Sequence, residues 1–164
     1  MVEPFTIRKA EERDAAQIAA QRRLMFAEGR NYTDRDLTQM EHRYAGWVQP
    51  RLVTGEYVAW LAEDTPNAVI AGAGLWLRDW PPILNDYTGR QGYIENVYTF
   101  PAYRRRGVAR QLMNTLLDWA RESQTLYGIA LHATDTARPL YASLGFESDS
   151  NVMSLWVGPK RAGN

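Results

Sequence analysis

The chain has 164 residues, contains no cysteine, and balances 19 acidic residues against 19 basic ones. This length suits one domain over residues 1–164, and a hydrophobic content of 45% is enough for a single core. The lack of cysteine excludes a disulfide framework and a thiolate nucleophile, while a formal charge of zero argues against a nucleic-acid-binding surface. Since the N-terminal residues do not look like a signal peptide and no apolar run approaches ~20 residues, we expect a cytoplasmic protein without a membrane span.

The first third of the chain predicts a strand followed by two helices. Residues 5–10 have strand composition, and Asp14 is a candidate N-cap for the helix that follows. Thr33 opens an approximate capping box, so we expect a second helix to begin there and to run toward Trp47, ending before Pro50.

Residues 57–63 and 68–77 predict a β-hairpin, because the four residues between them have turn composition. Gly72 and Gly74 interrupt the second of these strands. Glycine inside a strand indicates a bulge or a close approach of another group to the backbone.

A strand, a basic turn and a helix follow one another in the middle of the chain. Residues 93–100 are rich in aromatic and β-branched residues, and Pro101 ends this strand because it cannot donate to a sheet. From Val108 onward the apolar residues recur at helical spacing, so a helix begins near Gly107.

The basic turn consists of Arg104, Arg105 and Arg106, followed by Gly107. The first N–H groups of a helix lack partners inside the helix, so a phosphate can bind there, and glycine lets it come close. Arginines add charge-assisted hydrogen bonds, which favours a ligand with more than one phosphate. The alternative is a solvated arginine run, mildly repelled by the helix dipole.

Both faces of the 93–100 strand are expected to be covered, because neither is uniformly polar. Strict alternation places Tyr93, Glu95, Val97 and Thr99 on one face. A carboxylate in a covered strand must be paired, hydrated or functional. Glu95 is therefore either a site residue or the partner of an arginine.

The C-terminal part predicts a short strand over 129–133, then a helix capped by Asp135 or Thr136 and ended by Gly145. Phe146 is expected to open the next strand. A last strand over 152–157 and a mobile tail over 158–164 complete the chain.

Two motifs in this order resemble one family. The segment Arg104-x-x-Gly107-x-Ala109 is similar to the Q/R-x-x-G-x-G/A signature of the GNAT superfamily of acyl-CoA-dependent N-acetyltransferases, and Tyr141-x-x-x-Gly145-Phe146 is similar to the Tyr-x-x-x-Gly-Phe that ends its last helix. The resemblance implies an α/β (α+β) fold. It consists of a mixed, mostly antiparallel central sheet with a splayed parallel strand pair in the middle and helices on both faces.

The resemblance also implies roles for residues. Tyr141 would donate a proton to the leaving sulfur, and Glu95 would act as the base, directly or through water. Many family members have Asn seven residues before this tyrosine, where this chain has Thr134, so that contact would fall to Thr134 or Asp135. The residues expected to bind acetyl-CoA (coenzyme A) are Val97, Tyr98, Thr99, Arg104, Arg105, Arg106, Gly107, Val108, Ala109, Arg110 and Thr134.

These residues predict a direct acyl transfer. Strands that separate beyond Val97 would leave N–H and C=O groups free to bind the pantetheine arm, and an N–H near Val97 or Tyr98 would stabilise the oxyanion. Glu95 would deprotonate the amine and Tyr141 would protonate the thiolate. No covalent enzyme intermediate is required.

The sequence leaves the acceptor open. A primary amine of a small molecule is the leading prediction, a protein N-terminus or lysine is the alternative, and a non-catalytic acyl-CoA-binding module is a third. Phe26, Tyr32 and Tyr44 could face the acceptor or be core aromatics, and Asp79 and Trp80 could line its pocket or form a surface loop.

The remaining expectations concern a metal site and a homodimer. The two histidines, His42 and His132, are far apart in sequence and no cluster has metal-ligand spacing, so no metal site is predicted. His132 would be a satisfied strand residue or a polar residue lining the cleft. Trp156 could form an edge contact in a homodimer.

Overall fold

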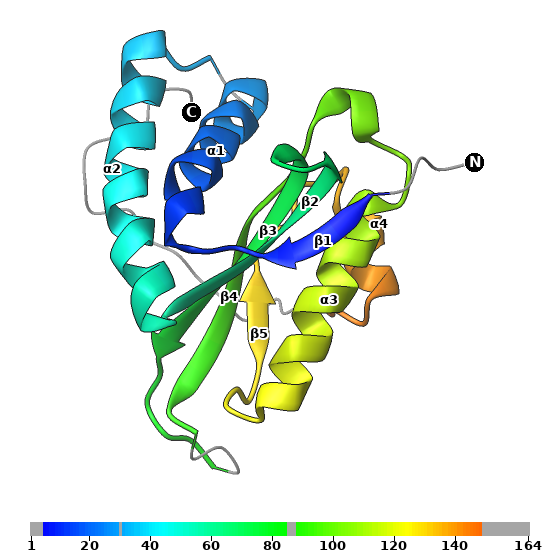
Figure 1. Cartoon of the computed structure of the whole chain (residues 1–164). Coiled ribbons are helices and arrows are strands. Elements are labelled where there is room, and N and C mark those ends of the chain that lie inside the picture. Colours follow the sequence, from blue (N-terminus) through cyan, green and yellow to red (C-terminus); the bar gives the residue numbers. More distant parts are fainter. Residues whose placement is uncertain (1–4, 30, 85–87, 149–164) are drawn as a thin grey trace.

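The computed structural model describes residues 5–29, 31–84 and 88–148 of the chain. In these residues a sheet has the strand order β1-β2-β3-β4-β5 (Figure 1). Neighbouring strands are antiparallel except β4 and β5, which are parallel. The strands are β1 (Thr6–Lys9), β2 (Tyr57–Thr65), β3 (Ala68–Asp79), β4 (Arg90–Thr99) and β5 (Ile129–Leu131). The predicted fold class is confirmed.

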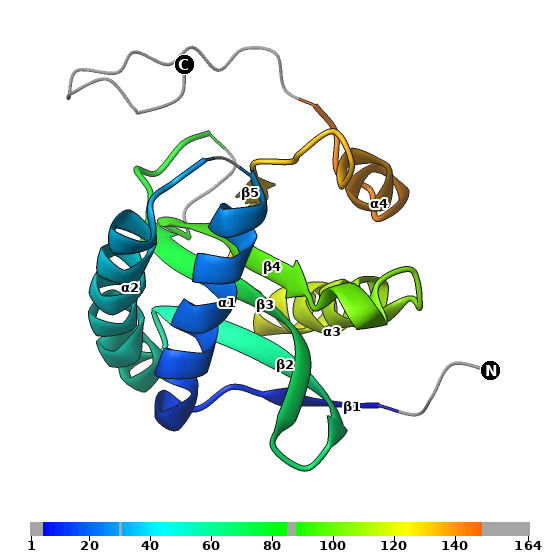
Figure 2. The same ribbon diagram turned by 90° about the horizontal axis from the view of Figure 1, so that it is seen from above.

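Helices cover both faces of the sheet. The helices α1 (Ala15–Gly29) and α2 (Asp34–Thr54) lie on one face, and α3 (Val108–Ser123) lies on the other (Figure 2). The short helix α4 (Arg138–Ser143) follows β5. Each covered face holds its own apolar cluster, so the sheet is buried on both sides as the mixed composition of its strands predicted.

The amphipathic pattern of α3 is the best predicted part of the core. Its apolar side faces the sheet, and Leu112, Met113 and Leu116 have no measurable exposure. Full burial of one such side chain contributes about 2 kcal/mol. This packing fixes where the first turn of α3 lies relative to β4.

Two helix boundaries differ from the predictions. Asp14 does not cap α1; it closes a 3-10 turn, Glu12–Asp14, and its carboxylate accepts a hydrogen bond from the Glu11 N–H. The helix α2 does not stop before Pro50 but continues to Thr54 and ends at Gly55, whose φ is 76°. The proline removes a single N–H, and the packing of α2 against the rest of the protein outweighs that loss.

The end of the described chain also departs from the predictions. Neither Asp135 nor Thr136 caps α4; the Thr134 hydroxyl accepts a hydrogen bond from the Ala137 N–H at 3.3 Å. Gly145 follows the helix with φ of 92°, as predicted, but Phe146 is not in a strand. The strand predicted over 152–157, the tail and Trp156 lie outside the described residues.

A bulge in β4 changes which side chains share a face. Between Gly72 and Gly74 of β3 the register shifts by one residue, and Asn96 takes a left-handed conformation with φ of 59°. After the bulge, Val97 packs in the cluster under α3, whereas Glu95 and Asn96 both contact the α1 and α2 side. The prediction that Glu95 and Val97 share a face is therefore wrong.

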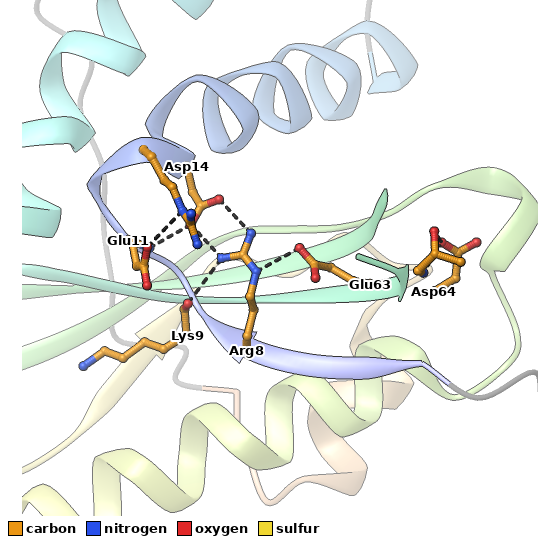
Figure 3. Close-up of polar contacts among 8 residues, drawn as sticks. Arg8, Lys9, Glu11, Asp14, Glu63 and Asp64 are labelled. Atoms are coloured by element: carbon orange, nitrogen blue, oxygen red, sulfur yellow. Dashed lines mark hydrogen bonds and ion pairs between the residues drawn. The ribbon is translucent and has the colours of Figure 1, made fainter. Parts of the chain in front are cut away.

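The first strand is attached by a cluster of charged side chains (Figure 3). The Arg8 guanidinium donates two hydrogen bonds to the Asp14 carboxylate, at 2.7 and 2.8 Å, and one to Glu63 at 2.8 Å. Both carboxylates are buried. The cluster joins β1, the 3-10 turn and β2, and so fixes the start of α1.

Candidate active site

A cavity of about 870 Å³ opens where β5 separates from β4. The parallel pairing covers only three residue pairs and ends with Ile94 opposite Leu131, although β4 continues to Thr99. The strands therefore separate earlier than predicted, before Val97. The cavity is bordered by α1, β4, the first turn of α3, β5 and α4, and residues of all five elements line it.

The separation leaves backbone groups of β4 facing the cavity. The Phe100 N–H donates to Ile70 of β3 at 2.9 Å, and successive residues of a strand point their backbone groups to opposite sides. The N–H groups of Thr99 and Val97 consequently point away from β3, where β5 offers no partner among the described residues. An extended ligand with amide groups could pair with them.

The first turn of α3 lies at the same cavity and can bind an anion. Its first intrahelical hydrogen bond runs from the Gln111 N–H to the Gly107 carbonyl, so the N–H groups of Val108, Ala109 and Arg110 precede it. Gly107 is in the left-handed conformation, with φ of 80°, and nothing lies within 4 Å of where a side chain would begin. A phosphate can approach these N–H groups closely.

The arginines of the turn differ in what they contact. Arg104 donates to both oxygens of Glu28 at 2.7 Å and to the Thr99 carbonyl, and Arg106 lies over the Tyr103 ring and does not line the cavity. Arg110 donates to the Ser143 hydroxyl at 2.9 Å. Arg105 lines the cavity, and no described residue pairs with it. Of the predicted arginines, Arg105 is thus the cation with most freedom to bind an anionic ligand.

Tyr141, on α4, also lines this cavity. Its ring packs edge-on against Phe146, and its hydroxyl has no hydrogen-bond partner among the described residues. Burial raises the pKa of the Tyr141 phenol above its usual value. The phenol is therefore protonated at neutral pH.

Glu95 lies in the wall formed by β4, and both interpretations of it have support. Its carboxylate is 3.2 Å from Nη1 of Arg22, so it is paired with an arginine. It also accepts a hydrogen bond from the Tyr44 hydroxyl at 3.1 Å, and it lines the cavity. Its side chain is 16% exposed, so a ligand or a water molecule in the cavity can reach it.

Comparison with known proteins identifies the family. Residues 19–146 match the model of the Acetyltransferase (GNAT) family, which covers most of the chain and both motifs. The chain belongs to this family. It is therefore an acyltransferase of the acetyltransferase type, and the resemblance seen in the sequence is confirmed. No curated protein matches the sequence.

Solved structures agree with this assignment. A GCN5-related N-acetyltransferase from Ralstonia eutropha is 30% identical, with a TM-score of 0.80 over 94% of this chain and 100% of that one. A predicted acetyltransferase from Clostridium acetobutylicum, solved with acetyl-CoA, is 29% identical, with a TM-score of 0.82 over 94% and 97%. A ribosomal-protein-alanine N-acetyltransferase from Brucella melitensis is 19% identical over 94% and 100%, with a TM-score of 0.64, and shares the fold.

Several other residues of this GNAT acetyltransferase reach the cavity. Arg22 and Phe26 of α1 line it, whereas Tyr44 is buried behind Glu95. His132 also lines it, and its Nδ1 shares a hydrogen bond with the Tyr93 hydroxyl. No local sequence pattern singles out Arg22, because its partner Glu95 is 73 positions away.

Two of the predicted acceptor-pocket residues do not reach the cavity. Asp79 ends β3, and Trp80 contacts the Arg78 guanidinium; neither lines the cavity. Thr134 does line it, but its hydroxyl oxygen already accepts the Ala137 N–H. That hydroxyl can still donate to a ligand.

No metal or membrane feature is found in the part of the chain that the structure describes. Within it, no three His, Asp or Glu side chains are grouped as metal ligands would be. Its helices are too short or too polar to cross a bilayer.

Proposed function

We propose that this protein transfers an acetyl group from acetyl-CoA to a primary amine of a small molecule, by direct attack in a ternary complex. The observation that supports this function is that one cavity brings together three features: a helix start that can bind an anion, an open strand edge, and two side chains, Glu95 and Tyr141, that can accept or donate a proton. An acyl transfer from a phosphorylated thioester to an amine needs all three.

The residues present fit coenzyme A. The N–H groups at the start of α3 and the Arg105 guanidinium would hold its diphosphate. The open edge at Val97 and Thr99 would pair with the amides of its pantetheine arm. Of the two N–H groups considered for the oxyanion, that of Val97 points away from β3 and is the better placed.

The two proton-transfer roles fall to Glu95 and Tyr141. Glu95, directly or through a water, would accept the proton that the amine must lose before it attacks. Tyr141, kept protonated by burial, would give a proton to the departing thiolate. Neither step needs a covalent bond to the protein.

Thiol release with acetyl-CoA and a panel of amines and peptides tests this function. In Tyr141→Phe we expect kcat to fall roughly 100-fold or more, with acetyl-CoA binding retained, because only the proton donor is lost. Tyr127→Phe is the matched control, since Tyr127 is 62% exposed and outside this cavity. Equal turnover in both variants would remove Tyr141 from the mechanism, and faster acetylation of peptides than of small amines would favour the protein-acetylating alternative.

A further inference from the structure

Arg22 is the cation nearest to the proposed base, and its hydrogen bonds are mostly unused. Its side chain is 20% exposed, and it lines the cavity beside Glu95. One of its N–H groups donates to the Glu95 carboxylate at 3.2 Å. A guanidinium has five N–H donors, and no other described residue accepts from Arg22.

Two aromatic rings fix the orientation of this guanidinium. Its central carbon lies 4.3 Å from the Tyr44 ring centre and 5.1 Å from that of Phe26. With its faces against aromatic rings, a guanidinium binds further groups only at its edge. Because Arg22 is part of the cavity wall, the unused N–H groups are available to a molecule inside it.

The charges around the cavity argue against a polycationic acceptor. In the part of the chain that the structure describes, the carboxylates that line the cavity are Glu28 and Glu95. Each is already paired, Glu28 with Arg104 at 2.7 Å and Glu95 with Arg22. An acceptor with several positive charges would have no unpaired carboxylate to bind among these residues. An anionic group could accept hydrogen bonds from the unused N–H groups of Arg22.

We propose that the acceptor is an amino acid whose carboxylate binds Arg22 while its amine faces Glu95. This inference deepens the proposed function and rests on it. Arg22 and Glu95 touch, so the two groups of the acceptor must be close, as the amine and carboxylate of an α- or β-amino acid are. The amine that ends a protein chain is next to an amide, not a carboxylate, and lacks this contact.

Matched substrate pairs test the inference. Amino acids with aromatic, aliphatic and polar side chains are assayed by thiol release at saturating acetyl-CoA, each beside its decarboxylated amine and its carboxamide. In kcat/KM, we expect the best amino acid to exceed its two analogues that lack the carboxylate by roughly ten- to a hundredfold, as charge-assisted hydrogen bonds would give. The carboxamide keeps the size of the carboxylate without its charge; because it also lowers the pKa of the neighbouring amine, the substrates are compared across a range of pH.

Variants separate carboxylate binding from support of Glu95. If Arg22 only positions Glu95, Arg22→Met lowers kcat/KM for the amino acid and both analogues by the same factor. If Arg22 binds the carboxylate, Arg22→Met removes the preference for the amino acid over its analogues. We expect the preference to fall to near unity. Arg23→Met is the control, because Arg23 pairs with Asp34 and Glu41 and does not line the cavity; it should keep the preference.

Each outcome is decisive. If amines are acetylated but the wild-type enzyme shows no preference for carboxylates, or if Arg22→Met keeps that preference, the inference is wrong and the proposed function stands. If acetyl-CoA binds but no amine in the panel releases thiol, the proposed function fails and the inference fails with it.

Discussion

Two of the arginine–carboxylate clusters in the described residues, those of Arg8 and Arg22, use their guanidinium groups differently. Arg8 donates to Asp14 and Glu63 through hydrogen bonds of 2.7 to 2.8 Å (Figure 3). Arg22 donates once, at 3.2 Å, to Glu95. The first cluster ties β1 to β2 away from the cavity, and the second lies in the cavity wall.

From this difference we infer that the Arg8 cluster is structural and that the Arg22 cluster serves the proposed function. When the hydrogen-bonding capacity of a buried arginine is met by the protein, removing a partner leaves an unpaired charge and lowers stability. When that capacity is unmet and the guanidinium lines a cavity, the remaining N–H groups can bind a ligand. The variants below are expected to act on stability in the first cluster and on turnover in the second.

The largest effect is expected in Glu95→Gln. Loss of the base should lower kcat roughly 100-fold or more at neutral pH, while the free energy of unfolding changes by only about 1 kcal/mol. The rate of the variant should keep rising with pH toward the pKa of the acceptor amine, about 10, because the amine must then lose its proton unaided. A pH–rate profile that matches the wild-type profile would exclude Glu95 as the base.

Gly74→Ala is expected to disturb the Arg22–Glu95 cluster indirectly, through Tyr57 and Tyr44. A side-chain carbon at Gly74 would come within 1.8 Å of the Tyr57 hydroxyl, which lies 3.4 Å from that of Tyr44. Displacing the buried Tyr57 ring should cost about 2–3 kcal/mol and lower kcat severalfold by moving Tyr44 away from Glu95. Gly46→Ala in α2, where nothing lies within 4 Å, is the control and should be neutral or stabilising. Chemical denaturation and thiol release measure both effects, and wild-type stability in Gly74→Ala would contradict this packing.

Asp14→Asn should affect only stability. Burial opposes ionisation of Asp14, but the hydrogen bonds from Arg8 and the Glu11 N–H outweigh it, so the pKa of the carboxyl is lowered. We expect a loss of about 2 kcal/mol at pH 7, with kcat unchanged. Because the pKa of this carboxyl is lower in the folded state than in the unfolded state, its ionised form stabilises the folded protein at pH values above the unfolded-state pKa. This stabilisation is lost as the pH falls through the folded-state pKa.

The pH dependence supplies the check on that variant. The stability difference between wild type and Asp14→Asn should be full at neutral pH and shrink below about pH 4, since the unfolded carboxyl titrates there. Urea unfolding at several pH values measures it. A difference that grows on acidification, or a fall in kcat at pH 7, would show that this cluster is not purely structural.

Local patterns predicted well where α3 begins and that Tyr141 lies on the following helix. Gly107 and the helical spacing after it placed the start of α3, and Tyr141 followed from a short motif near Gly145. These features depend on residues close together in sequence. The parallel strand pair was also foreseen, although it separates after Ile94 and not beyond Val97.

The acceptor side could not be predicted in the same way. The bulge at Asn96 breaks the alternation of β4, and Gly72 and Gly74 hinted at it without showing which residues would change face. The pairing of Arg22 with Glu95 depends on how α1 crosses β4, which no local pattern encodes. Pro50 predicted a helix end that tertiary packing overrides.

The proposed function depends most directly on binding of the acetyl-CoA diphosphate at the first turn of α3. Ala109→Glu tests it by calorimetry, with the nearly isosteric Ala109→Gln as control. A carboxylate in the first turn should stabilise the free helix by about 0.3–1 kcal/mol but repel a diphosphate. We predict that Ala109→Glu binds acetyl-CoA at least roughly tenfold more weakly than Ala109→Gln. Equal affinity of the two variants would place the diphosphate elsewhere and contradict the account.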